Sequence, residues 1–92
     1  MHPTTKQPTI YVATMPGCPA CADAKRHLPA FRRAHPGVSV VLFNVLEADW
    51  PDAIRGAAPD MTPTYWMVAG GKVKRKHAGW MTASELGAWA KG

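Results

Sequence analysis

The two cysteines of this 92-residue chain, Cys18 and Cys21, have only two residues between them. A bond between them would close too short a loop to constrain the unfolded chain much, so stabilising the fold is a poor reason for their presence. In a reducing compartment such thiols also stay reduced rather than serving as a structural staple. The spacing therefore indicates a chemically active pair, and the chain around it must hold both side chains at one site.

The residues on either side of the pair predict a strand, a loop and a helix. Thr9–Thr14 is a short run with high β propensity, and the breakers Pro16 and Gly17 follow it. From Pro19 to about Ala34, apolar residues recur at helical spacing and basic residues take the other faces. Pro29 should kink or locally break this helix, because its ring removes one backbone hydrogen bond. The cysteine pair thus opens a helix.

The next segment predicts a second strand parallel to the first. Val38–Val45 is nearly all β-branched or large apolar residues, which is typical of a strand buried on both faces. Strand–helix–strand order predicts a parallel pair with a right-handed crossover. Asp49-Trp50-Pro51 then indicates the start of a short helix that ends at Gly56, with a loop through Asp60.

The remaining third predicts a hairpin and a closing helix. Thr64–Ala69 is a third strand, Gly70-Gly71 a tight turn, and Lys72–Ala78 a fourth strand with the exposed charges of a sheet edge. Thr82 and Glu85 have the spacing of a capping box, and Leu86, Trp89 and Ala90 supply the apolar stripe of a final helix. We expect one α/β domain over residues 1–92, with a four-stranded mixed sheet and a core of about residues 9–90.

Composition limits the classes of function. The chain is 47% hydrophobic and 18% charged, with no apolar run near the roughly 18 residues of a membrane span and no signal-type segment, so we expect a soluble, cytoplasmic monomer without a membrane partner. Its net charge of +5 invites a nucleic-acid interpretation. The basic residues, however, crowd a helix end and one hairpin without interleaved aromatic residues, so we expect no nucleic-acid partner.

A Cys-Pro-Ala-Cys motif between a strand and a helix, followed by Thr62-Pro63 before a third strand, resembles the thioredoxin and glutaredoxin superfamily. The similarity covers about residues 9–90. Proline after Cys18 is similar to the Cys-Pro-Tyr-Cys of glutaredoxins, whereas the hairpin and tail from Thr62 to Ala90 resemble thioredoxins. The resemblance implies a thioredoxin fold and a thiol–disulfide oxidoreductase without cofactor or metal. Its substrates would be protein disulfides or mixed disulfides, and its electrons would come from a thioredoxin reductase or from glutathione.

The chain departs from the patterns of these families in three regions. Gly17 stands where thioredoxins usually carry tryptophan, and Tyr11 and Val12 stand where they carry a buried acid. Gly79-Trp80-Met81-Thr82 replaces the Gly-Gly and acidic residues with which glutaredoxins hold glutathione. We therefore expect a thioredoxin-type electron donor, with a glutathione-dependent enzyme as the alternative.

The roles of the two thiols follow from their positions on the helix. Cys18 at the helix N-terminus faces unpaired N–H groups and the positive end of the helix dipole, so we expect a lowered thiol pKa and a nucleophile. Cys21, one turn on and facing inward, would resolve the mixed disulfide. The resemblance implies a cis Thr62-Pro63 bond opposite the cysteines, where an extended substrate would add as a strand. We expect an apolar rim around it, formed by Met15, Pro16, Pro19, Ala20, Met61, Ala78, Gly79 and Trp80.

Other interpretations remain beside this one. A zinc site could combine the cysteines with His27 and His35, although these histidines are eight residues apart rather than the usual three to five. His27, His35 and His77 are expected at the surface, and Asp23 or Asp60 could relay the proton of Cys21. Trp80 could instead be ordinary packing of the last helix. In a further alternative, the basic hairpin docks a partner and the cysteines are incidental.

The other tryptophans are expected in or near the core. They are Trp50, Trp66 and Trp89, with Trp66 and Met67 on opposite faces of a central strand.

Overall fold

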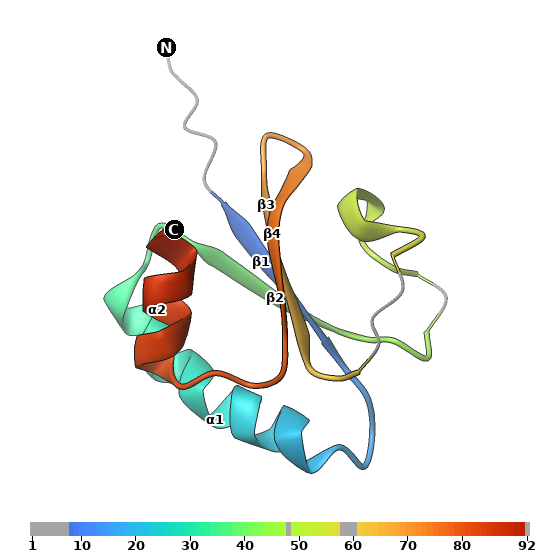
Figure 1. Ribbon diagram of the computed structural model, residues 1–92, viewed down its shortest axis with the longest axis horizontal. Helices are drawn as coiled ribbons and strands as arrows, with labels where there is room; N and C mark the ends of the chain where they lie inside the picture. The colour runs from blue at the N-terminus through green and yellow to red at the C-terminus, as the bar shows by residue number, and fades with distance from the viewer. Residues whose placement is uncertain (1–7, 48, 58–60, 92) are drawn as a thin grey trace.

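The computed structural model describes residues 8–47, 49–57 and 61–91. Its elements are β1 (Thr9–Thr14), α1 (Pro19–Ala34), β2 (Ser39–Asn44), the 3₁₀ helix η1 (Asp52–Ile54), β3 (Thr64–Ala69), β4 (Lys72–Ala78) and α2 (Ala83–Lys91). The strands form one sheet in the order β2-β1-β3-β4 (Figure 1). β1 runs parallel to β2 and antiparallel to β3, which pairs antiparallel with β4. The predicted α/β fold with a mixed four-stranded sheet is confirmed.

The two faces of the sheet carry separate apolar clusters. α1 and α2 cover one face, and η1 lies over the other (Figure 1). Trp66 and Met67, neighbours on β3, belong to opposite clusters, as alternation along a strand requires. Trp50 and Trp89 are half-buried, so the prediction of core or near-core tryptophans is confirmed. The larger cluster contains Ile10, Val12, Ala24, Leu28, Phe31, Tyr65, Met67, Met81 and Leu86.

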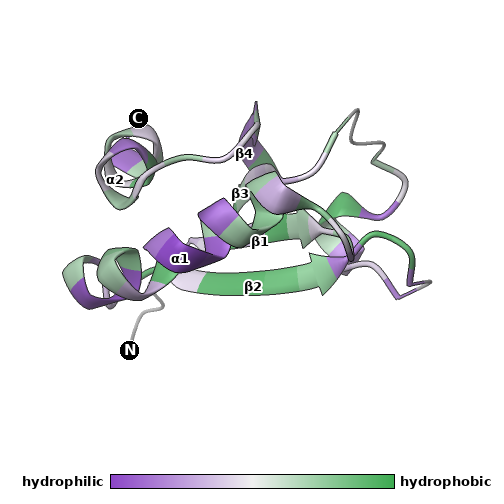
Figure 2. Cartoon of the chain, turned by 90° about the horizontal axis from the view of Figure 1, so that it is seen from below, coloured by the Kyte–Doolittle hydropathy of each residue, from purple (hydrophilic) through white to green (hydrophobic). Residues whose placement is uncertain are grey.

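Helix α1 has the bounds that the sequence predicted, but it is not broken at Pro29. Figure 2 shows it as an alternation of hydrophilic and hydrophobic residues, and its buried positions are Cys21, Ala24, Leu28 and Phe31. Pro29 lies exposed within the continuous helix. The carbonyl that loses its donor belongs to Lys25, itself an exposed residue, so water can take the place of the missing N–H. The predicted local break is therefore wrong, and the alternative of a kink stays a prediction.

Strand β2 differs from its prediction in length and burial. It spans Ser39–Asn44 rather than 38–45, and Val41 keeps 41% of its surface exposed. The reason is the strand order, which places β2 at an edge where only β1 bonds to it. Arg32 donates to the carbonyl oxygen of Val40 at 3.1 Å, which occupies one acceptor of this strand. The expectation of burial on both faces was wrong.

The segment expected to be a helix from Asp49 to Gly56 contains one turn, the 3₁₀ helix Asp52–Ile54. Pro51 precedes this turn, and Gly56 follows it with a φ of 91° that favours glycine. Ile54 is buried under the sheet and anchors the segment. The predicted loop through Asp60 lies partly outside the described residues.

The hairpin and the last helix follow the sequence prediction. Gly70 and Gly71 both have positive φ in the turn between β3 and β4. At the start of α2 the N–H of Thr82 donates to the Glu85 carboxylate at 2.9 Å, and the N–H of Glu85 donates to the Thr82 hydroxyl at 3.1 Å. This reciprocal pair is the predicted capping box. Neither described α-helix has the length and apolar character that crossing a bilayer requires.

Candidate active site at the Cys18–Cys21 disulfide

Cys18 and Cys21 are joined by a disulfide at the start of α1, with their Cα atoms 5.2 Å apart. Cys18 is the N-cap residue and is half-buried, whereas Cys21 has only 2% of its surface exposed. The backbone of the strand-to-helix turn thus presents one sulfur outward and holds the other against the core. This arrangement agrees with the expected order of roles, and the roles themselves stay predictions.

The first turn of α1 directs an N–H group at the outer sulfur. The backbone N–H of Cys21 lies 3.1 Å from Cys18 Sγ and also 3.1 Å from the Cys18 carbonyl oxygen. Pro19, at the first helical position, has no N–H to offer. A negative charge that forms on Cys18 Sγ when the disulfide is reduced would meet this donor and the positive end of the helix dipole.

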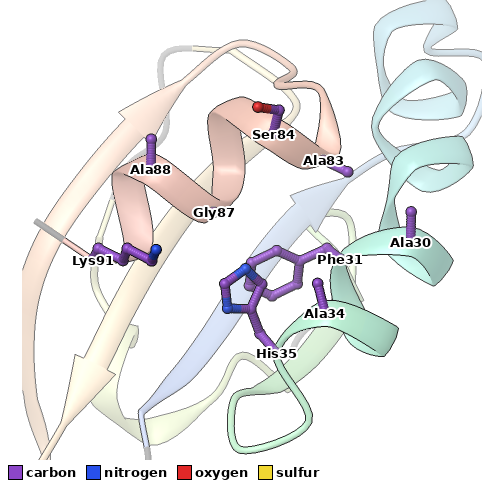
Figure 3. A pocket seen from close by; sticks show the side chains of 9 residues that line it. All are labelled: Ala30, Phe31, Ala34, His35, Ala83, Ser84, Gly87, Ala88 and Lys91. Carbon is purple, nitrogen blue, oxygen red and sulfur yellow. The ribbon is translucent and has the colours of Figure 1, made fainter.

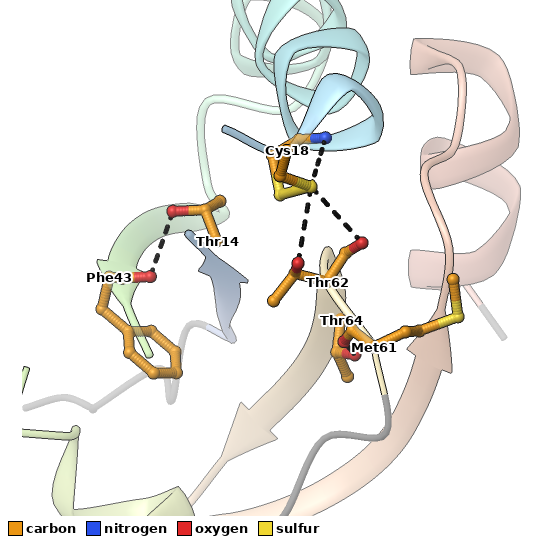
Figure 4. The surroundings of a disulfide bond; sticks show 7 residues. Thr14, Cys18, Phe43, Met61, Thr62 and Thr64 are labelled. Carbon is orange, nitrogen blue, oxygen red and sulfur yellow. Dashed lines mark hydrogen bonds between the residues drawn. A yellow bond between two sulfur atoms is a disulfide. The ribbon is translucent and has the colours of Figure 1, made fainter. Parts of the chain in front are cut away.

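Thr62 faces the same sulfur from the loop before β3 (Figure 4). Its hydroxyl donates to Cys18 Sγ at 3.4 Å, and its carbonyl oxygen lies 3.5 Å from that sulfur. The second contact becomes a hydrogen bond only in the thiol form, because a disulfide sulfur carries no proton. The Thr62-Pro63 bond is cis, as the resemblance implied. Pro63 is buried, and its carbonyl oxygen accepts the N–H of Gly79 at 2.9 Å, which joins the two loops.

The predicted rim residues fall into two groups around the disulfide. Met15, Pro16 and Pro19 line an open hollow beside the sulfurs, whereas Ala20 is half-buried and outside that hollow. Met61 and Trp80 come from the loops beside Pro63 and are 49% and 41% exposed. Ala78 is the last residue of β4, and Gly79 connects it to Trp80. The hollow is lined by Met15, Pro16, Gly17, Cys18, Pro19, Cys21, Ala22 and Lys25.

Exposed apolar side chains gather at the end of the sheet that carries the disulfide. β1, β2 and β4 finish there and β3 begins there, because Thr14 pairs with Asn44 and Thr64 with Ala78 (Figure 1). Six large apolar residues are exposed in the described part of the chain, and four of them, Met15, Leu46, Met61 and Trp80, belong to loops at this end. Leu46, 72% exposed, was missed. It could have been found, since it follows a strand predicted to run parallel to β1.

Trp80 packs on α1 rather than within α2. Its indole stacks on the imidazole of His27, with ring centroids 5.6 Å apart and planes 16° from parallel. Both interpretations of this residue therefore hold in part, because one face is packed and 41% of the surface remains exposed beside the site.

The three histidines expected at the surface rather than in catalysis are each partly exposed and partly packed. Each lies against an aromatic ring distant in the sequence or one turn away, a neighbour that residue spacing alone does not show. His27 stacks on Trp80, and His35 stacks on Phe31 with 4.7 Å between ring centroids. The ring centroid of His77 lies 6.1 Å from that of Tyr65 and 6.4 Å from that of Trp89. Within the described ranges, no three His, Cys, Asp or Glu side chains cluster closely enough to hold a metal.

Tyr65 anchors the loop that carries Trp80. Its side chain is fully buried, and its hydroxyl oxygen accepts the N–H of Met81 at 3.2 Å. Burial raises the pKa of Tyr65, the nearby Glu85 carboxylate raises it further, and the Met81 N–H partly opposes both. No local pattern of residues predicted this contact.

Of the two acids proposed as proton relays, the structure describes only Asp23. Asp23 lies beyond the first turn of α1 and pairs with Arg26 on the same helix. Asp60 is outside the described residues.

No family model matches the chain, and no curated protein matches it in sequence. Solved structures do share its architecture. Thioredoxin-2 of the malaria parasite, a component of its protein secretion machinery, superimposes with a TM-score of 0.82 over 97% of this chain and 85% of its own, at 10% identity. Oxidised mitochondrial thioredoxin 3 from Saccharomyces cerevisiae superimposes with a TM-score of 0.78 over 94% of this chain and 78% of its own, at 22% identity. StoA from Bacillus subtilis superimposes with a TM-score of 0.72 over 96% of this chain and 85% of its own, also at 22% identity.

These likenesses establish the fold. The chain has the thioredoxin fold, with a Cys-x-x-Cys disulfide at the N-terminus of its first helix.

Proposed function

We propose that this protein is a thiol–disulfide oxidoreductase that reduces protein disulfides or mixed disulfides through Cys18 and Cys21. The observation that carries the proposal is the asymmetry of the pair. Cys18 Sγ is reachable and receives the N–H of Cys21, while Cys21 is buried one turn behind it. A disulfide that served only to stabilise the fold would need neither the accessible sulfur nor the N–H directed at it.

The exchange proceeds in two steps from the dithiol form. The thiolate of Cys18 attacks one sulfur of the substrate disulfide, the substrate S–S bond breaks, and the departing substrate sulfur takes a proton. The thiolate of Cys21 then attacks Cys18 Sγ, which releases the second substrate thiol and leaves the Cys18–Cys21 disulfide. The substrate gains two electrons and two protons. A donor dithiol, or two molecules of a monothiol such as glutathione, returns them to the pair.

The exposed apolar residues at the site support protein substrates. Met15, Leu46, Met61 and Trp80 lie in loops at the end of the sheet that carries the disulfide, and they expose apolar surface that an unfolded or extended chain can cover. Thr62 lies against Cys18 Sγ in the loop just before β3, where a substrate backbone could add as a strand.

The loop before α2 favours a reductase over glutathione as the electron donor. A glutathione site needs groups for two carboxylates and an ammonium, and the acidic residues expected for the ammonium are replaced by Trp80 and Met81. The backbone N–H groups here are also engaged, that of Met81 with Tyr65 and that of Thr82 with Glu85. We therefore propose a thioredoxin-type reductase that docks on the apolar rim, with weak turnover by glutathione.

Insulin reduction, assayed separately with a thioredoxin reductase system and with a glutathione system, tests the activity and its electron source. Cys18→Ser should abolish reduction, and Cys21→Ser should accumulate a covalent mixed disulfide visible by mass spectrometry. Ala34→Ser, which adds a hydroxyl at the exposed C-terminal end of α1 and keeps both thiols, is the matched control. Cysteine variants as active as the control would favour an interaction module with incidental cysteines.

A further inference from the structure

Lys25 occupies the same stripe of α1 as the two cysteines. Residues 18, 21, 22 and 25 are spaced by three or four, so their side chains lie along one side of the helix. All four line the hollow beside the disulfide. Lys25 thus lies about two helical turns from Cys18 along α1, in a hollow that both cysteines also line.

Lys25 is the one charged residue among the eight that line this hollow. In the part of the chain that the structure describes, the ion pairs join Arg26 to Asp23 and Arg55 to Asp52, and Lys25 takes part in neither. Asp23 thereby offsets the charge of Arg26 on the adjacent face. The positive potential beside Cys18 comes from Lys25 together with the N-terminal end of α1.

We infer that Lys25 is a specificity-determining residue, and that it gives the site a preference for disulfides with a carboxylate close to the reacting sulfur. The inference rests on the proposed function and names the substrate class of that site. The remaining lining is apolar or small, so a carboxylate in the hollow finds its charge partner at Lys25. A substrate ammonium at the same place would be repelled, and a neutral group would gain nothing from the charge.

Stoichiometric thiol–disulfide exchange measures this preference without requiring turnover. The reduced protein is mixed with dithiodipropionate, bis(2-hydroxyethyl) disulfide or cystamine, which are anionic, neutral and cationic. Each protein disulfide formed releases two small thiols, so the total number of thiols does not change. The rate at which the protein itself loses the thiols of Cys18 and Cys21 is therefore followed by mass spectrometry after acid quenching. Lys25→Gln should lower the anionic-to-neutral rate ratio by about threefold to fivefold, the scale of one partly solvated charge pair. Lys25→Glu should lower it further and raise the cationic-to-neutral ratio. High salt should reduce the preference of the unmodified protein.

Lys72→Glu is the control for net charge, because Lys72 begins β4 at the end of the sheet opposite the site. It makes the same charge change as Lys25→Glu, and should leave both ratios within about twofold of the unmodified protein, since exposed charges that far apart are screened. Equal effects of the two substitutions, or unchanged ratios in Lys25→Glu, would overturn the inference. The proposed function is judged separately, because failure to reduce insulin catalytically would reject it while these exchange ratios still report on Lys25.

Discussion

Trp80 and His27 stack face to face across the gap between the loop before α2 and the middle of α1, with 5.6 Å between ring centroids. The two residues are 53 positions apart in the sequence, and their contact fixes the angle of the indole beside the disulfide loop. Because 41% of Trp80 remains exposed, the packed face holds the ring still while its outer surface is available to a partner.

Trp80→Ala should therefore weaken the binding of protein substrates but not of small disulfides. Removing an exposed aromatic contact from a binding surface costs about 1 kcal/mol, so we expect KM for insulin to rise about fivefold with little change in kcat. Turnover of bis(2-hydroxyethyl) disulfide, which is too small to reach the indole and the sulfurs together, should stay within about twofold. His27→Ala, which leaves the indole without its support, should give a smaller rise in KM.

The control for this series is Val73→Ala, because Val73 is 44% exposed on β4 but does not belong to the site. It should leave KM for insulin unchanged. An equal loss with both disulfide substrates would show that Trp80 acts on the chemistry or on folding rather than on protein docking.

Alkylation should distinguish the two thiols of the reduced protein. Cys18 is half-buried with an N–H directed at its sulfur, while Cys21 keeps 2% of its surface exposed. We expect iodoacetamide at mildly acidic pH to label Cys18 at least tenfold faster, a difference readable from peptide masses, because the thiolate is the reactive form and the donor stabilises it. First labelling of Cys21 would reverse the assignment of nucleophile and resolving thiol.

The sequence predicted the bounds of β1, α1, β3 and β4 because each is flanked by strong breakers. Pro16 and Gly17 end the first strand, and Gly70 and Gly71 separate the last two. It failed at β2 and at the short helix after it. An apolar run such as 38–45 shows that a strand has hydrophobic side chains but does not show its place in the sheet, and the order β2-β1-β3-β4 puts it at an edge.

The same limit applies to the site. The cysteine spacing and the Thr62-Pro63 pair are local signals, and the structure brings Thr62 to Cys18 as the resemblance implied. The contact of Trp80 with His27 depends on two side chains that only the folded chain brings together. Lys25 is a further case. The basic residues of α1 were expected on the faces away from Cys21, and the structure instead places Lys25 in the hollow that both cysteines line.

Tyr65→Phe should destabilise the protein and flatten its loss of stability at alkaline pH. Without the hydroxyl, the N–H of Met81 loses its acceptor, which costs about 1–2 kcal/mol. Burial raises the pKa of Tyr65 above the ordinary value of 10.0, so the unfolded phenol ionises first as the pH rises. Its contribution to stability is present in full below about pH 10 and is lost as the pH rises through the folded pKa.

Urea unfolding of both proteins at several values between pH 7 and pH 11 measures this difference. The difference between their free energies of unfolding should be constant up to about pH 9 and then become smaller, because only the unmodified protein has the Tyr65 phenol that ionises on unfolding. A difference in the free energy of unfolding that stays constant to pH 11 would contradict a raised pKa of Tyr65 in the folded protein.

Gly87 on α2 meets His35 at the end of α1, in the hollow between the two helices (Figure 3). A Cβ atom added at Gly87 would lie 3.0 Å from His35 Nε2, and the imidazole is itself stacked on Phe31, so it has little freedom to withdraw. Helix propensity alone predicts that Gly87→Ala stabilises α2 by about 0.8–1 kcal/mol. Against that gain stands the cost of forcing a packed side chain aside, about 1–3 kcal/mol.

We expect the contact to dominate, so that Gly87→Ala is destabilising by about 1 kcal/mol. In a His35→Ala background the obstacle is gone, and the same substitution should become stabilising by nearly the full propensity gain, which makes the coupling energy about 2 kcal/mol. Denaturant unfolding of the four proteins of this double-mutant cycle measures it. If Gly87→Ala has the same effect in both backgrounds, the imidazole does not restrict this position and helix propensity alone accounts for the change.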